Sequence, residues 1–281
     1  MQKLVQKIRA MNRYRILRHR YKSRSRTLTR NLKRPPRETK EGFQLIHDKF
    51  PFPDEWESAN RELLCKLLPN VSLFVNVGAN VGFYCCMAQS LGVRTIALEP
   101  EPANCQFLCK NLSINGFAND VEVLPVAAGR TPPRIAQIFG SRDTASLSAQ
   151  FNRGSAFGQF VPVFSLDDIV LGHRWVSGKT LLMIDVEGWE QHVLEGARGL
   201  LGLEPKPFWI IEILPDPEAR RIEPTQAFAI MFEHGYRAYR ILRQGDLVEV
   251  TEESVYPLLS QEHDEWNYLF IDNRLSVEAF I

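Results

Sequence analysis

Long apolar runs are absent from this sequence. None of its 281 residues belongs to a run of about 18 consecutive apolar residues, the length that crosses a bilayer. The first residues are too charged and too poor in apolar side chains for a secretory signal. We therefore expect neither a membrane-spanning nor an exported protein, and we expect it in the cytoplasm. The 44% of hydrophobic residues is enough to fill a core, so a folded chain is expected.

Cysteine is scarce, and its spacing excludes some kinds of site. The five cysteines form no pair of pairs of the kind that binds zinc, and an odd number does not favour a disulfide framework. We expect reduced thiols that pack in the core, and no metal site is predicted. The cysteines are Cys65, Cys85, Cys86, Cys105 and Cys109.

Acidic residues are nearly missing from the first 40 positions. Residues 1–40 hold 15 of the 34 Lys and Arg residues and a single acid, Glu38. The remaining chain has 19 basic and 32 acidic residues, a net charge of −13. An acidic body does not favour a nucleic-acid groove, so nucleic acid is not an expected partner.

Apolar residues recur at helical spacing among the basic residues from Met1 to about Arg26. This pattern predicts an amphipathic basic helix that ends before Pro35-Pro36. Residues 1–34 could bind an anionic membrane surface, as a peripheral attachment, or an acidic partner; the alternative is a solvated extension. We therefore divide the chain into a basic amphipathic arm and linker, residues 1–40, and one folded domain, residues 41–281.

Short apolar strands alternate with helices over most of the folded domain. This alternation predicts right-handed crossovers and a mostly parallel sheet with helices. An interruption at residues 130–180, with a polar loop at 140–158, predicts inserted strands and a lid. Within it, Ser165 is expected to cap a short helix. The predicted strands are 73–77, 94–99, 122–126, 181–185, 208–213, 236–242 and 268–272, and the predicted helices are 83–90, 103–114, 191–201 and 225–233.

Two glycines, Gly78 and Gly82, flank the loop after the first predicted strand. A glycine after a buried strand permits a sharp turn, and a second lets a ligand approach the main-chain N–H groups. The spacing differs from the G-x-G-x-x-G motif of dinucleotide binding. Glu99 follows Gly78 by 21 residues at the end of the next strand, close to the spacing expected for an acid that binds ribose hydroxyls. Alternatively, Glu99 caps the helix that follows Pro100.

A second group of carboxylates follows the strand that ends at Ile184. Asp185 and Glu187 precede Gly188 and Glu190, and Glu212 ends another apolar strand. Carboxylates at the carboxyl edge of a sheet are costly to bury without a partner, which the positive charge of a sulfonium would supply. One of them could also take the proton of an acceptor hydroxyl. The alternative for Glu187 and Glu190 is a favourable interaction with a helix N-terminus.

These motifs, in this order, resemble the FkbM family of S-adenosylmethionine-dependent methyltransferases. The resemblance implies a Rossmann-like class I methyltransferase with a mostly parallel seven-stranded sheet, helices on both faces and an inserted lid. It also implies O-methylation of a sugar, glycan or natural-product hydroxyl. Two positions depart from the family pattern: Asn76 replaces an Asp, and Met183 replaces a Lys. The matching segments are 76–84, 97–100, 165–168, 184–188 with Glu190, and 211–212.

The resemblance assigns roles to particular residues. Asp185 and Glu187 are the expected catalytic residues. The residues expected to bind S-adenosylmethionine are Asn76, Gly78, Ala79, Asn80, Gly82, Glu99 and Asp185. Two other hypotheses stay open: a non-catalytic, membrane-associated adaptor with a degenerate methyltransferase fold, and an RNA methyltransferase. The acidic body and the lack of a base-flipping motif do not favour the second.

Overall fold

The computed structural model describes residues 31–47, 57–140, 145–147, 158–173, 175, 179–214, 224–260 and 265–280. The helix predicted over residues 1–26 lies outside these residues, and so does most of the predicted polar loop 140–158. Near the start of the described chain, β1 (Arg37–Glu38) pairs antiparallel with β2 (Gln44–Leu45). This first hairpin therefore spans residue 40, where the sequence predicts that the arm ends.

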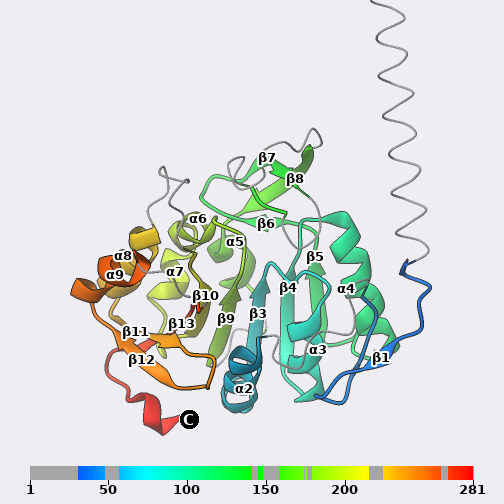
Figure 1. Ribbon diagram of the computed structural model, residues 1–281. Helices are drawn as coiled ribbons and strands as arrows, with labels where there is room; N and C mark the ends of the chain where they lie inside the picture. The colour runs from blue at the N-terminus through cyan, green and yellow to red at the C-terminus, as the bar shows by residue number, and fades with distance from the viewer. Residues whose placement is uncertain are drawn as a thin grey trace, which may run out of the picture.

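One large sheet organises the described chain (Figure 1). Its strand order is β12-β11-β13-β10-β9-β3-β4-β5, and the five strands from β10 to β5 are parallel to one another. β13 runs antiparallel to both β10 and β11, and β12 runs antiparallel to β11. The strands are β3 (Leu73–Val77), β4 (Arg94–Leu98), β5 (Val121–Leu124), β9 (Thr180–Ile184), β10 (Phe208–Glu212), β11 (Tyr236–Ile241), β12 (Leu247–Val250) and β13 (Asn267–Asp272).

The predicted α/β, Rossmann-like sheet is confirmed, but its predicted number of strands is wrong. The sheet has eight strands and not seven, because β12 adds a hairpin partner at the edge. This strand, LVEV, has only four residues and is largely exposed, so its pattern is too short to identify it from the sequence. The turn before it contains Gly245 in the left-handed region, with φ of 86°, which permits the tight reversal.

Helices cover both faces of the sheet, as the resemblance predicts. Successive side chains of a strand point to opposite faces. In β3, Leu73, Val75 and Val77 therefore pack in one cluster and Phe74 packs in the other. The first cluster includes α5 (Leu166–Val170), α6 (Glu190–Glu195), α7 (Arg198–Leu201), α8 (Pro224–Glu233) and α9 (Glu252–Leu259); the second includes α2 (Ser58–Leu67), α3 (Phe83–Ser90) and α4 (Pro102–Ile114).

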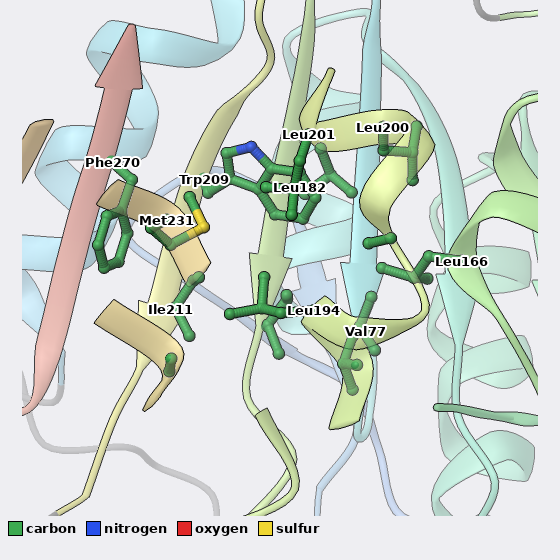
Figure 2. Packing of buried hydrophobic residues seen from close by; sticks show 14 of the residues in the cluster. Val77, Leu166, Leu182, Leu194, Leu200, Leu201, Trp209, Ile211, Met231 and Phe270 are labelled. Carbon is green, nitrogen blue, oxygen red and sulfur yellow. The ribbon is translucent and has the colours of Figure 1, made fainter. Parts of the chain in front are cut away.

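Large side chains from neighbouring strands form the first cluster (Figure 2). Trp209 and Ile211 of β10 lie beside Leu182 of β9, and Leu194, Leu200 and Leu201 cover them from α6 and α7. All of these side chains are buried. Burying a side chain of this size stabilises the fold by about 1.5–3 kcal/mol. The cluster therefore fixes how α6 and α7 sit against the sheet.

The interruption at residues 130–180 forms a small second sheet. Its strands are β6 (Ala127–Ala128), β7 (Arg134–Phe139) and β8 (Gly158–Phe164), in the order β6-β8-β7. Figure 1 shows β7 and β8 beyond the ends of the strands of the large sheet. Ser165 then caps α5 by accepting a hydrogen bond from the Asp168 N–H at 3.1 Å. The predicted inserted strands and the predicted cap are confirmed.

One predicted helix is wrong: the pattern over residues 191–201 predicts a single helix, and the structure breaks it into α6 and α7. The break falls at Gly196 and Ala197. A Cβ at Gly196 would lie 2.0 Å from the carbonyl oxygen of Gly129, which follows β6. The small sheet thus presses against the corner between the two helices. The sequence also gave no indication of α2 and α9, whose polar residues hide their apolar positions.

Replacing Gly196 with Ala should destabilise the protein. The added methyl group cannot avoid the Gly129 backbone without separating the small sheet from α6, and overpacking of this kind costs about 1–3 kcal/mol. The matched control is Gly202→Ala, because a Cβ there meets its nearest atom at 3.6 Å. Urea unfolding should give a clearly lower midpoint for G196A than for G202A, and equal midpoints would contradict the proposed contact.

Candidate functional site

A cleft opens at the carboxyl ends of β3, β4 and β9, under the small sheet. It encloses about 580 Å³, part of which is open to solvent. Parallel sheets bind ligands at this edge, where the chain turns from strand to helix. Among the described residues, the cleft is lined by Val77, Gly78, Asn80, Leu98, Glu99, Pro100, Asn104, Val126, Ala127, Ala128, Ile138, Ala145, Ser146, Leu147, Asp185, Val186, Glu187 and Trp189.

Gly78 is required where β3 and β9 end. Its φ of 86° lies in the left-handed region, and a Cβ at this position would lie 1.8 Å from the carbonyl oxygen of Asp185. Gly82 also has φ of 86°, and a Cβ there would lie 2.4 Å from the Leu108 side chain on α4. Both glycines therefore permit close packing within the protein, Gly78 between strand ends and Gly82 between loop and helix.

The N–H groups of this loop are largely paired within the protein. Gly78 and Ala79 both donate to the Leu98 carbonyl, and Gly82 donates to the Ala79 carbonyl. Asn80 donates its N–H to Glu99 Oε2 at 2.6 Å. The sequence predicted that the glycines open these groups to a ligand, whereas the structure uses them to hold the loop. A loop paired in this way is not a phosphate cradle, in line with the absence of the dinucleotide motif.

Glu99 lies at the end of β4 and is buried, with 4% of its surface exposed. It accepts hydrogen bonds from the Asn80 N–H and, at 2.8 Å, from the Glu101 N–H. Burial raises its pKa to about 7, although these hydrogen bonds act in the opposite direction. The cap of α4 is Glu101, which accepts the Asn104 N–H at 2.7 Å. The alternative that Glu99 caps this helix is therefore not what the structure shows.

Asp185 and Glu187 both line the cleft, in the turn between β9 and α6. Glu187 has φ of 55° and Gly188 has φ of 85°, so two consecutive residues are left-handed. The Ser146 hydroxyl donates to the Glu187 carbonyl at 2.7 Å, and Glu190 Oε1 accepts the Gly188 N–H at 3.0 Å. A left-handed non-glycine residue costs free energy, and such residues gather at functional sites. These two hydrogen bonds hold the strained turn.

The Asp185 carboxyl is paired with that of Glu212, at the end of β10. Burial raises the pKa of Asp185 well above its usual range, and the charges of Glu212 and Glu57 raise it further. Burial also raises the pKa of Glu212 to about 7, while its hydrogen bond with Asp185 lowers it. Since two close carboxylates resist simultaneous ionisation, the raised pKa values of Asp185 and Glu212 favour a protonated pair over two negative charges.

Several residues at the cleft were not predicted from the sequence. Glu57, at the start of α2, accepts a hydrogen bond from the Tyr84 hydroxyl, and its charge affects Asp185 and Glu212. Asn104 and Trp189 line the cleft, and each has a buried polar atom without a hydrogen-bond partner among the described residues. Pattern analysis treats such residues as polar positions of a helix or as core, so it offered no means of finding them.

The structure thus brings five of the predicted site residues to one cleft: Gly78, Asn80, Glu99, Asp185 and Glu187. The other three, Asn76, Ala79 and Gly82, are not among its lining residues. Asn76 is buried in β3, and its side-chain amide donates to Cys85 Sγ at 3.4 Å. Ala79 is also buried and packs with α3 and α4.

The described residues that line the cleft are acidic or uncharged. Three of its lining residues are acidic, and none of the described lining residues is Lys or Arg. The described residues contain no group of three His, Cys, Asp or Glu side chains placed to hold a metal ion. In the same part of the chain, no helix is both long and apolar enough to cross a bilayer.

The open α/β sheet has its glycine turn and the acid after its second parallel strand at the positions that the resemblance to methyltransferases implies. A model of the methyltransferase FkbM domain matches residues 76–238, more than half of the chain. The chain belongs to this family, and the resemblance predicted from the motifs is confirmed. None of the curated proteins compared with the chain matches it.

Solved structures give more distant likenesses. A precorrin-6y C5,15-methyltransferase from Geobacter metallireducens has a TM-score of 0.41 and 13% identity, over 80% of this chain and 91% of that one. The cofactor-bound protein Rv0187 from MTB has a TM-score of 0.43 and 13% identity, over 89% of this chain and 88% of that one. A putative O-methyltransferase from Klebsiella pneumoniae has a TM-score of 0.39 and 12% identity, over 77% of this chain and 80% of that one. Likenesses this distant do not bear on activity.

The buried carboxyls should make the protein less stable as pH rises. Because the folded-state pKa values of Glu99 and Glu212 are raised from 4.5 to about 7, the folded protein binds protons more tightly than the unfolded chain. Their contribution to stability is present below pH 4.5 and is lost as pH rises through 7. Glu212→Gln should therefore raise the melting temperature at pH 8 by a few degrees and flatten its dependence between pH 5.5 and 8.

The matched control is Glu62→Gln, which removes a carboxyl that is 63% exposed. Thermal unfolding of this variant should follow the parent protein at every pH. If Glu212→Gln also follows the parent, Glu212 does not hold its proton in the way described.

Proposed function

We propose that this protein is an S-adenosylmethionine-dependent methyltransferase that acts on the hydroxyl oxygen of a sugar, glycan or other small molecule. The observation that carries the proposal is the cleft of a methyltransferase-family sheet in which carboxylates gather without a lysine or arginine. Such a cleft favours a cationic ligand and disfavours a phosphate.

The residues present fit the cofactor. Glu99, with its remaining lone pairs, suits ribose hydroxyls, and the nearby oxygens of Asn80 and Asn104 lack donors among the described residues. Pro100, Val126 and other apolar residues offer flat contacts for an adenine ring. Gly78 and Asn80, the residues of the glycine turn that line the cleft, would hold the amino-acid part. When bound, S-adenosylmethionine supplies a methyl group on a sulfonium sulfur, which is already activated for transfer.

The protein's own contribution is to position the acceptor and remove its proton. Holding an acceptor oxygen in line accounts for most of the rate enhancement in a transfer of this kind. Glu187 is the better candidate for the base, because burial and the neighbouring Glu212 raise the pKa of Asp185 and disfavour its ionised form. The Asp185–Glu212 pair would ionise fully when a positive charge enters the cleft, and would then stabilise it.

The adaptor hypothesis loses support from the positions of the two departures from the family pattern. Asn76 and Met183 are both 2% exposed, and neither lines the cleft. Asn76 lies on the face toward α3, and Met183 packs in the same cluster. Neither substitution therefore removes a group from the cleft. No feature of the described residues favours an RNA substrate.

Calorimetry with S-adenosylmethionine tests the proposal directly. The full chain should bind one equivalent with a dissociation constant on the order of micromolar. Glu99→Gln should weaken binding about tenfold or more, because it removes a charge-assisted acceptor. An absence of binding by the parent protein would rule out the proposed cofactor, and binding without methylation of any hydroxyl acceptor would favour the adaptor.

Replacing Glu187 with Gln should separate binding from chemistry. The change keeps the size of the side chain, so cofactor affinity should stay within about threefold, while turnover falls by about 10²–10⁴ because the base is lost. Methyl incorporation into a panel of glycan and lipid-linked sugar acceptors, followed by mass spectrometry, measures turnover. Glu249→Gln, in the exposed part of β12, is the control. Unchanged turnover in Glu187→Gln would remove this residue from the mechanism.

A further inference from the structure

Two amide oxygens without partners face the same end of the cleft. Asn104 Oδ1 and Asn80 Oδ1 are buried and accept no hydrogen bond from the described residues, and both residues line the cleft. Asn104 is 2% exposed. An unpaired buried carbonyl is costly, and nearly all such groups in native proteins are satisfied. These oxygens therefore point to a ligand that brings donors.

The orientation of the Asn104 side chain follows from its surroundings. Its N–H is held by Glu101 Oε2 at 2.7 Å, which fixes the backbone in the first turn of α4. Its side chain hydrogen-bonds to Glu99 and lowers the pKa of that carboxyl. Because an ionised carboxylate only accepts, the Asn104 amide must turn its NH₂ group toward Glu99. Its oxygen is then the atom left for a ligand.

Asn80 contacts Glu99 through its backbone. Its N–H donates to Glu99 Oε2 at 2.6 Å, and its φ of 50° is left-handed. The Asn80 backbone and the Asn104 side chain thus both donate to the Glu99 carboxylate. Beside this carboxylate, the two buried side-chain oxygens without a partner, Asn80 Oδ1 and Asn104 Oδ1, are acceptors.

This group of neighbouring acceptors limits the kind of ligand that can bind beside Glu99. It suits a vicinal diol, which brings two O–H donors close together, and it excludes a phosphate on either hydroxyl, since a phosphate is an anionic acceptor. We propose that Asn104 is a specificity-determining residue that accepts a hydrogen bond from one ribose hydroxyl of the cofactor while Glu99 accepts from the other. This inference rests on the proposed function and extends it to a residue outside the predicted site.

The test compares four ligands by calorimetry: S-adenosylhomocysteine, its 2′-deoxy and 3′-deoxy analogues, and the inosine analogue that lacks the adenine amino group. The parent protein should bind at least one deoxy analogue about tenfold more weakly than S-adenosylhomocysteine. Asn104→Leu, which removes both amide groups at similar volume, should weaken S-adenosylhomocysteine about tenfold. The affinity of Asn104→Leu for that deoxy analogue should equal the affinity of the parent protein. The preference for the intact ribose diol should therefore disappear in this variant.

Asn115→Leu is the matched control on the same helix, because Asn115 bonds to the backbone of Gln44 and does not line the cleft. It should keep the full preference for the ribose diol. If Asn104→Leu does not fold, Asn104→Ser serves instead, since its hydroxyl is too short to place an acceptor at the same point. Melting temperatures of all variants identify those that fold.

The outcomes separate this inference from the proposed function. The inference is supported if Asn104→Leu loses the preference for the ribose diol and Asn115→Leu keeps it. Retention of that preference, or equal binding of all four ligands by the parent protein, overturns it while the cofactor assignment stands. Selective loss of the preference for adenine over hypoxanthine also overturns it, because the oxygen would then face the base. If the parent protein binds none of the four ligands, the proposed function itself fails.

Discussion

The close approach of β3 and β9 at their carboxyl ends is the constraint on which the site depends. Only a glycine fits at residue 78, because the Cβ of any other residue would clash with the carbonyl oxygen of Asp185. The left-handed turn at Gly78 directs the following N–H groups toward β4, where Leu98 and Glu99 accept them. One backbone contact thus sets the positions of Asp185 and Glu99 together. The two ends of the cleft are coupled through β3, which lies between β9 and β4.

Burying several carboxyl groups at this cleft lowers the stability of the protein when no ligand is bound. Burial raises the pKa values of Glu99, Asp185 and Glu212, so part of the folding free energy is used to hold carboxyl groups away from water. A site that only supported the fold would lose this cost through apolar substitution. A ligand with a positive charge and several donors would lower the cost, so binding and stability are linked at these residues.

Much of the fold could be predicted from the sequence, because it depends on local patterns. The strand at residues 73–77 is apolar at every position except Asn76 because both of its faces are covered, and the Ser165 cap needs only its own turn. The elements that the sequence did not reveal depend on tertiary contacts. The break at Gly196 results from the Gly129 carbonyl, a residue far away in sequence. The edge strand β12 exists because β11 offers it a partner.

The site divides in the same way. Glu99, Asp185 and Glu187 end apolar strands, so pattern and spacing identify them. Asn104 looks like any polar residue of a helix, and only its buried, unpaired oxygen distinguishes it. Likewise, a sequence pattern gives no reason why Gly82 should pack on Leu108 and leave the cleft to Asn80.

The small sheet accounts for the other half of the cleft. Ile138, Ala145 and Leu147 give it apolar walls, and Ser146 joins it to the Glu187 carbonyl at 2.7 Å. The insertion therefore contacts the turn that carries the candidate base, whereas the parallel strands hold Glu99 at the opposite end. The described residues of the insertion supply these apolar walls, whereas the acids that line the cleft all come from the loops after the strands of the large sheet. Under the proposed function, an acceptor placed beside Glu187 would therefore contact these walls.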